Sequence, residues 1–360
     1  MMTDLMMART VRERNAKQER LVTWVGLACI LSAPAWIYGL LFPFPSSFPL
    51  AIENDLASLS VIVLVVLTLQ IAFILRLGAS NRFIAEVMMV GFLLKLAAVS
   101  AYIFTAVHVY GSVGDVFFYF TSGLQIVDKH SLTGEWTILR PLWSTKFIVM
   151  LTTWFVFVLG RSFQGLMILF AAISYWGQYL FFRSFCIAFP AFSRRGAALF
   201  MFFLPSLVFW TATIGKDAVI FFFIGGSCYG FAKLTQSGSF AGMFTVLVSL
   251  AGVMLVRPHV AGMLAVSLAS AYLLARNRHA LRKRYGVWNI AAKSVGVPLL
   301  LLASFYFVAQ ARTFVDLNDV EQTQSVLERA GNVNLQLQGS TFGSSLPYRL
   351  LAAPFMLFRP

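Results

Sequence analysis

Several residues that could take part in acid–base or phosphate chemistry lie at the ends of long apolar runs. Asp115 lies in the stretch GSVGDVFFYFTSG, directly after one such run. Lys216 and Asp217 adjoin each other in TIGKDAVIFFF, and Arg257 and His259 flank a proline in VRPHVAG. A carboxylate can serve as a general base, and lysine and arginine side chains bind phosphate groups. These residue types indicate a site that removes a proton and neutralises a phosphate.

Each of these residues also has a simpler structural interpretation. Asp115 could cap the helix that follows it, and Asp217 could favour the positive end of a helix dipole. Lys216 could reach from a span end to water, and Arg257 could belong to an ordinary hairpin. In the functional interpretation, Asp115 is the base, Lys216 and Arg257 are phosphate ligands supported by Asp217, and His259 is a further ligand or base.

The composition of the chain predicts an all-α polytopic membrane protein. Hydrophobic residues make up 59% of the 360 residues and charged residues only 12%. A soluble domain has about a quarter of its residues charged, so one large soluble core is excluded. The net charge of +14 comes from basic residues in the connectors between apolar runs. The positive-inside rule explains this charge, and no nucleic-acid partner is expected.

The apolar runs predict about nine transmembrane helices within residues 21–310. Their expected ranges are 21–42, 56–77, 83–107, 163–182, 196–213, 218–234, 240–256, 260–275 and 294–310. Residues 1–20 are basic and predict a cytoplasmic N-terminal tail, with no cleaved signal peptide after it. With this alternation, 108–162 forms an extracytoplasmic loop and 311–360 an extracytoplasmic C-terminal segment.

The apolar run 146–160 is only about fifteen residues long, which is short for a membrane span. If it crossed the membrane, Arg183, Arg194 and Arg195 would lie on the outer side, against the positive-inside rule. We therefore expect this run to be an outer juxtamembrane helix. The loop between the third and fourth spans is expected to hold such juxtamembrane helices.

Lys95 lies in the middle of the third predicted span. Charge inside a membrane indicates a functional residue, although a lysine side chain can also extend toward water. The three cysteines, Cys29, Cys186 and Cys228, lie in or beside apolar runs without metal-ligand spacing. No metal site and no cofactor are predicted.

The order of these features resembles the GT-C class of integral-membrane glycosyltransferases. An outward span is followed by Asp115, by VFFYFTSGLQIV and STKFIVMLTTWFVFVLG as two surface helices, and by Arg161 before SFQGLMILF. The likeness covers about residues 83–217. The second acid that often accompanies the first in this class is missing here, as is the large soluble C-terminal domain of some members.

The resemblance implies an inverting transfer of a sugar from a polyprenyl-linked donor to a glycan or lipid acceptor. The reaction would take place on the outer face of the cytoplasmic membrane, in cell-envelope or exopolysaccharide synthesis. Asp115 would deprotonate the acceptor, while Lys216, Arg257 and Arg349 neutralise the phosphate leaving group. Arg161 and Lys95 would support this site.

Three other functions remain open. A polymerase of lipid-linked polysaccharide repeats would also need outer-face arginines for phosphate groups. A lipid or polysaccharide transporter should line a central cavity with charge, yet apart from Glu86 and Lys95 the predicted spans are nearly free of charge. The third alternative is an assembly subunit of an envelope complex.

Overall fold

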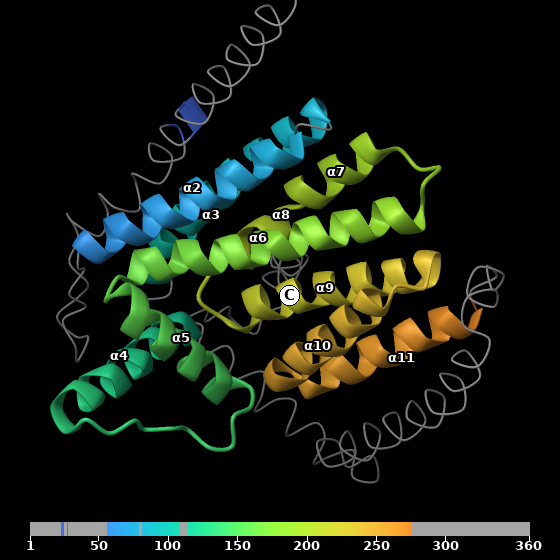
Figure 1. The fold of residues 1–360 in the computed structure, drawn as a ribbon. Helices are drawn as coiled ribbons and strands as arrows, with labels where there is room; N and C mark the ends of the chain where they lie inside the picture. The colour runs from blue at the N-terminus through green and yellow to red at the C-terminus, as the bar shows by residue number, and fades with distance from the viewer. Residues whose placement is uncertain (1–22, 25–26, 28–55, 79–80, 109–113, 275–360) are drawn as a thin grey trace, which may run out of the picture.

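The computed structural model describes residues 23–24, 27, 56–78, 81–108 and 114–274, and in this part the chain is all-α, as predicted. Figure 1 shows the arrangement of its helices. Their bounds are α2 Leu56–Gly78, α3 Arg82–His108, α4 Asp115–Thr133, α5 Thr145–Leu159, α6 Phe163–Ala188, α7 Arg194–Phe203, α8 Pro205–Phe209, α9 Lys216–Ser237, α10 Phe240–Val256 and α11 Pro258–Leu274.

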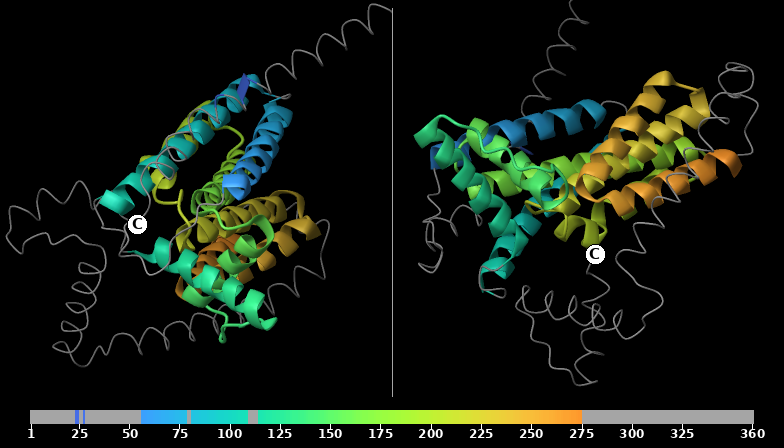
Figure 2. Two further views of the ribbon diagram at one scale, coloured as in Figure 1. Left: turned by 90° about the vertical axis from the view of Figure 1, so that its left-hand side faces the viewer. Right: turned by 90° about the horizontal axis from the view of Figure 1, so that it is seen from below.

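Helix α6 lies at the centre of the bundle. It packs against α9 on one side, and α9 packs in turn against α10, with α11 beyond it. On the other side of α6 lie α2 and α3, and α3 also contacts α7 and α8. Figure 2 shows the same layers in two further views. The long helices lie lengthwise beside one another, so the connections between them gather at the two ends of the bundle.

Four described helices are long and apolar enough to cross a membrane by their length and hydropathy. They are Ala57–Leu77, Arg82–Ala106, Phe163–Ala188 and Lys216–Ser237. These helices correspond to the predicted spans 56–77, 83–107, 163–182 and 218–234. The described part of the chain thus has four candidate membrane-spanning helices.

The other predicted spans agree with the observed helices to different degrees. Helix α10 has the predicted bounds and α11 begins two residues earlier than expected, but each has 17 residues. The segment 196–213 forms two short helices, α7 and α8, because Pro205 cannot continue the first one. The expected spans 294–310 and nearly all of 21–42, with the tails 1–20 and 311–360, lie outside the described residues.

Two helices occupy the segment between the third and fourth predicted spans, where two surface helices were expected. Helix α4 has 19 residues and ends at Gly134, whose φ of 72° is the left-handed conformation that glycine tolerates best. Helix α5 has 15 residues and packs against α4. Both are inclined to the long helices and gather at one end of the bundle (Figure 1).

Small residues allow the central helices to approach closely. A Cβ added to Gly177 of α6 would lie 2.6 Å from the carbonyl oxygen of Phe221 on α9. A Cβ added to Gly230 of α9 would lie 2.7 Å from the carbonyl oxygen of Gly242 on α10. Small residues at such crossings are typical of helix packing in membranes, where backbones can approach only without side chains between them.

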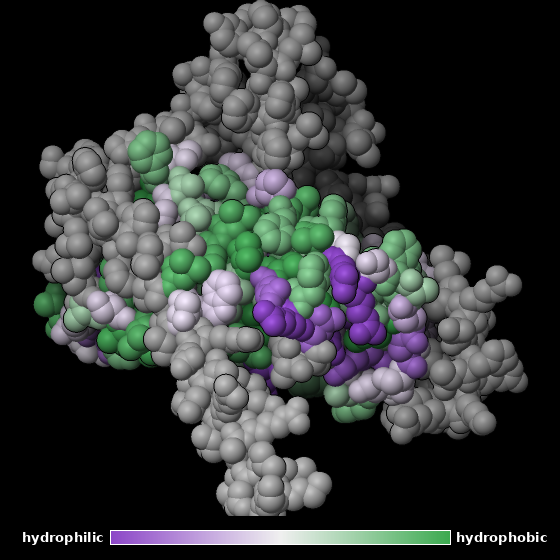
Figure 3. All heavy atoms as spheres, turned by 90° about the horizontal axis from the view of Figure 1, so that it is seen from above, coloured by the Kyte–Doolittle hydropathy of each residue, from purple (hydrophilic) through white to green (hydrophobic). Residues whose placement is uncertain are grey.

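The basic end of the bundle is the end opposite α4 and α5, and it carries five exposed arginines. They are Arg76, Arg82, Arg183, Arg194 and Arg195. Helix α2 ends there, α3 and α7 begin there, and α6 approaches its end there. In Figure 3, hydrophilic side chains gather toward one end of the face shown, beside a largely hydrophobic area. This separation of charge from apolar surface matches a protein with a membrane around its middle.

Candidate functional site

Four of the residues singled out in the sequence meet at the end of the bundle opposite the basic end. Asp115 begins α4, Lys216 and Asp217 begin α9, and Arg257 follows α10. The charges of Asp115, Asp217 and Arg257 all act on the ammonium group of Lys216. We call these four residues the charged cluster. Its two carboxylates and two cations come from three separate stretches of the chain.

The Asp115 carboxylate is exposed and bound by a neighbouring hydroxyl. Helix α4 begins at Asp115 itself, with Gly114 as its cap residue. The Tyr119 hydroxyl donates a hydrogen bond to Asp115 Oδ2 over 3.2 Å. These residues are four apart, so they lie on the same face of the helix. The Tyr119 side chain is buried, which fixes the direction of the carboxylate it binds.

Burial raises the pKa of the Tyr119 hydroxyl well above its ordinary value, and the negative charge of Asp115 raises it further. The hydroxyl therefore keeps its proton at neutral pH and remains a donor to the carboxylate. The Thr145 side chain at the start of α5 also interacts with this hydroxyl. Tyr119 thus links the charged cluster to both helices of the inclined pair.

An ion pair joins the members of the charged cluster that come from α9 and from the end of α10. A guanidinium nitrogen of Arg257 lies 3.0 Å from Asp217 Oδ1. Both side chains are about a third exposed, at 38% and 34%, so they reach solvent. A guanidinium carries five N–H donors, and one ion pair leaves most of them for another anion. Asp217 also lies in the first turn of α9, where the helix dipole favours a negative charge.

Backbone contacts hold the ends of these helices together. The Ser144 N–H donates to the Leu255 carbonyl over 2.7 Å, which joins the start of α5 to the end of α10. The Ile214 N–H lies 3.3 Å from the Met167 sulfur on α6. Residues 211–215 form a buried turn that leads directly into Lys216. Buried, hydrogen-bonded backbone segments therefore hold the residues of the charged cluster in position.

Lys95 lies away from the charged cluster and is completely buried between α3, α6 and α8. Its ammonium group donates to Thr211 Oγ1 over 2.6 Å, to the Leu207 carbonyl over 3.1 Å and to Gln178 Oε1 over 3.5 Å. Ser174 donates to the Thr211 carbonyl over 2.7 Å. Irregular backbone inside a membrane must find such partners. Lys95 therefore supports the segment that precedes Lys216, residues 196–213, which is interrupted before Pro205. We call it the interrupted segment.

The remaining predicted site residues do not belong to the charged cluster. Arg161 forms an ion pair of 2.5 Å with Asp128 and so ties α4 to the start of α6. Because Asp128 is 13 positions after Asp115 on one helix, this pair lies about 20 Å from the charged cluster. His259 is exposed in the first turn of α11, two residues after Arg257. Arg349 lies outside the described residues.

The sequence interpretation overlooked Tyr119 and Thr145. The only signal for Tyr119 in the sequence is its spacing of four residues from Asp115, which places both on one face of a helix. Thr145 carried no such signal, because its position depends on how α5 packs on α4.

Within the described ranges, no three His, Cys, Asp or Glu side chains form a group that could hold a metal ion. Comparison with known protein families, with curated proteins and with solved structures finds no match for this chain.

Proposed function

We propose that this protein is a membrane glycosyltransferase that moves a sugar from a polyprenyl-linked donor to a glycan or lipid acceptor. The observation that carries the proposal is the charged cluster, which sets an exposed carboxylate, Asp115, beside Lys216 and the Arg257–Asp217 pair. The resemblance to GT-C glycosyltransferases supports the same assignment. The reaction would serve cell-envelope or exopolysaccharide synthesis at the outer face of the cytoplasmic membrane.

In the proposed reaction, Asp115 accepts the proton of an acceptor hydroxyl. The acceptor oxygen attacks the anomeric carbon of the sugar from the side opposite the phosphate. The bond between that carbon and the phosphate oxygen breaks, and its electron pair leaves with the phosphate. The products are an inverted glycoside and the free polyprenyl phosphate or diphosphate. Tyr119 orients the Asp115 carboxylate through its hydrogen bond.

Lys216 and Arg257 supply the positive charge that this leaving group requires. A phosphate gains negative charge as the sugar departs, so cations placed beside it stabilise the transition state more than the ground state. The planar guanidinium of Arg257 can bind two phosphate oxygens at once, whereas Lys216 acts as a compact charge. Asp217 keeps Arg257 at this position through their ion pair.

The first experiment tests on which side of the membrane the charged cluster lies. Single cysteines replace exposed residues in a chain without its native cysteines, and intact cells are treated with an impermeant thiol reagent. Ser131→Cys, in the last turns of α4, and His259→Cys should react. Ser237→Cys, at the other end of α9, should react only after the cells are opened. The reverse pattern would place the cluster in the cytoplasm and exclude the proposal.

The second experiment tests the proposed base. Cells that depend on an Asp115→Asn variant should lose the surface glycan and accumulate polyprenyl-linked sugar, measured by mass spectrometry of extracted lipids. The transfer rate should fall at least about 100-fold, the usual contribution of a general base. Asp128→Asn is the matched control, because it removes a half-buried carboxylate from the same helix, where its partner is Arg161 and not the charged cluster. Unchanged glycan in Asp115→Asn cells would contradict the proposal.

A further inference from the structure

A second site lies at the basic end of the bundle, far from the charged cluster. A cavity of about 280 Å³ opens there between the end of α2, the start of α3, the end of α6 and the start of α7. Its lining residues combine apolar side chains with two arginines. They are Leu77, Asn81, Ile84, Met88, Tyr179, Phe182, Arg183, Cys186, Ile187 and Arg194.

The cavity changes from polar to apolar with depth. Along α3 its lining residues pass from exposed Asn81 through half-buried Ile84 to Met88, which is 1% exposed. On α6, Arg183 is exposed while its neighbour Phe182 is 3% exposed. The cavity therefore has a charged mouth at the surface and a hydrophobic floor in the core.

The positive charges at the mouth converge on one place. Arg183 and Arg194 come from different helices, and both act electrostatically on the Cys186 thiol between them. Arg183 also interacts with the Tyr179 hydroxyl. None of the described residues that line the cavity is acidic. The mouth thus offers two guanidinium groups to an anion without a competing carboxylate.

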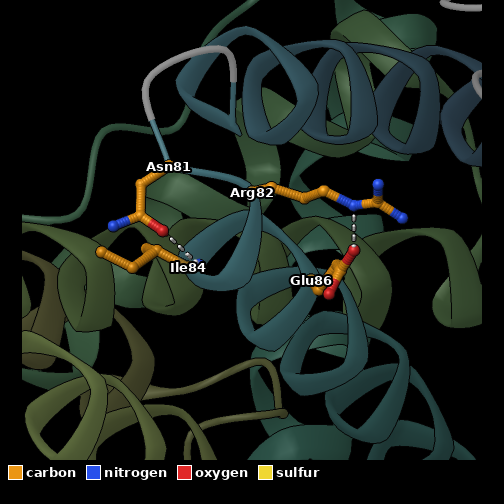
Figure 4. Close-up of polar contacts among 4 residues, drawn as sticks. All are labelled: Asn81, Arg82, Ile84 and Glu86. Carbon is orange, nitrogen blue, oxygen red and sulfur yellow. Dashed lines mark hydrogen bonds and ion pairs between the residues drawn. The ribbon is translucent and has the colours of Figure 1, made fainter.

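Figure 4 shows the polar contacts at the start of α3, beside this cavity. Asn81 caps the helix by accepting a hydrogen bond of 3.3 Å from the Ile84 N–H, and both residues line the cavity. Arg82 extends to the other side and pairs with Glu86 over 2.7 Å. Arg82 is therefore paired outside the cavity, whereas Arg183 and Arg194 line it.

We propose that this cavity binds an anionic phospholipid, with the phosphate between Arg183 and Arg194 and the start of an acyl chain against Phe182 and Met88. A free phosphate ion would need the arginines but not the apolar floor. A hydrocarbon alone would need the floor but not the arginines. Basic pockets between membrane helices are suited to anionic headgroups. This inference is independent of the proposed glycosyl transfer.

The test uses the full-length protein in detergent and counts bound lipid by native mass spectrometry. Dioctanoyl phosphatidylglycerol should bind, and dioctanoyl phosphatidylcholine should bind much more weakly. The double variant Arg183→Gln/Arg194→Gln should weaken binding of the anionic lipid roughly 30-fold, from the usual contribution of two arginines near a lipid surface. Arg82→Gln is the matched control and should leave binding within about twofold, because its charge is already paired.

A second variant tests the apolar part of the site without changing the charges. Ile187→Trp should fill the cavity and weaken binding of the same lipid although both arginines remain. Equal binding of the two lipids, or no effect of the double variant, would overturn the proposal. Displacement of the lipid by an equal concentration of inorganic phosphate would also overturn it, because the site would then bind the ion alone.

Discussion

The guanidinium of Arg257 lies 3.0 Å from the carboxylate of Asp217, although 40 positions separate them in the chain. Arg257 follows the last residue of α10 and Asp217 lies in the first turn of α9, so the pair joins two helix ends. Arg257 is followed by Pro258, which begins α11 and fits the first position of a helix. The ion pair thus holds a three-helix junction beside Lys216.

The first prediction separates the two members of this pair. Arg257→Gln should lower the transfer rate about 100-fold, because in the proposed reaction this cation stabilises the leaving group in the transition state. Asp217→Asn should lower the rate much less, because it removes only the counter-ion of that arginine. Rates are measured as surface glycan formed per unit of protein in the membrane.

Protein stability provides the control for this comparison. Exposed ion pairs contribute about 0–1 kcal/mol, so both variants should unfold in detergent near the wild-type temperature. If Arg257→Gln and Asp217→Asn lose activity equally, the pair acts only as a structural link and Arg257 is not a phosphate ligand.

The second prediction concerns alkaline pH. Burial and the Asp115 charge hold the pKa of Tyr119 above its ordinary value of about 10, so the folded protein keeps this proton when the unfolded chain loses it. The folded state then binds more protons, and its stability falls as the pH rises above about 10. The loss from this one group is about 1.4 kcal/mol per pH unit until the folded pKa is reached.

Tyr119→Phe removes this hydroxyl, so the stability of the variant should depend less on pH above about pH 10. The measurement is the unfolding temperature of both proteins in detergent from pH 8 to about pH 11. The unfolding temperature of the wild type should fall relative to that of the variant only above about pH 10. A constant difference across the whole range would show that the hydroxyl titrates alike in both states.

Much of the fold could be predicted from the spacing of apolar residues. The long helices begin and end near the expected positions because a membrane requires about 20 apolar residues per span and tolerates charge only at the ends. The same alternation of spans indicated that Asp115, Lys216 and Arg257 would share one end. The pairing of Arg257 with Asp217 depends on how α10 crosses α9, which composition does not specify.

The interrupted segment was the main departure from this pattern. Pro205 is visible in the sequence, but its effect is not, because a proline can also kink a continuous helix. Beyond the break, the Leu207 carbonyl accepts hydrogen bonds from the Thr211 hydroxyl and from Lys95, which lies 112 positions away. Such a contact between distant residues depends on the packing of α3 against α8. Arg161 likewise pairs with Asp128 because of the length and tilt of α4.

The third prediction concerns the close packing of α9 on α10. Gly230→Ala should destabilise the protein by about 1–3 kcal/mol, because the new methyl group would meet the Gly242 carbonyl oxygen at 2.7 Å and the helices would have to separate. Gly196→Ala is the matched control. Its added methyl has nothing closer than 3.9 Å, so the same substitution should stabilise α7 slightly. Equal effects at the two positions would contradict the packing argument.

The fourth prediction concerns Lys95. Lys95→Ala should lower the free energy of unfolding by about 3 kcal/mol or more, because it leaves a cavity and removes the donor to Thr211 and the Leu207 carbonyl. Lys95→Met keeps most of the volume and removes a buried charge that is costly to desolvate. Its loss should be smaller, about 1–2 kcal/mol, because Thr211 Oγ1 and Gln178 Oε1 lose this donor while the Leu207 carbonyl still accepts from the Thr211 hydroxyl.

Activity distinguishes a positioning role of Lys95 from a direct one. Lys95 supports the turn that leads into Lys216. The variant that loses more free energy of unfolding should therefore also lose more of the transfer rate. Lys95→Met should then retain more activity than Lys95→Ala. Complete loss of transfer in Lys95→Met with a wild-type unfolding temperature would instead make the buried ammonium part of the chemistry, because packing and stability would be intact.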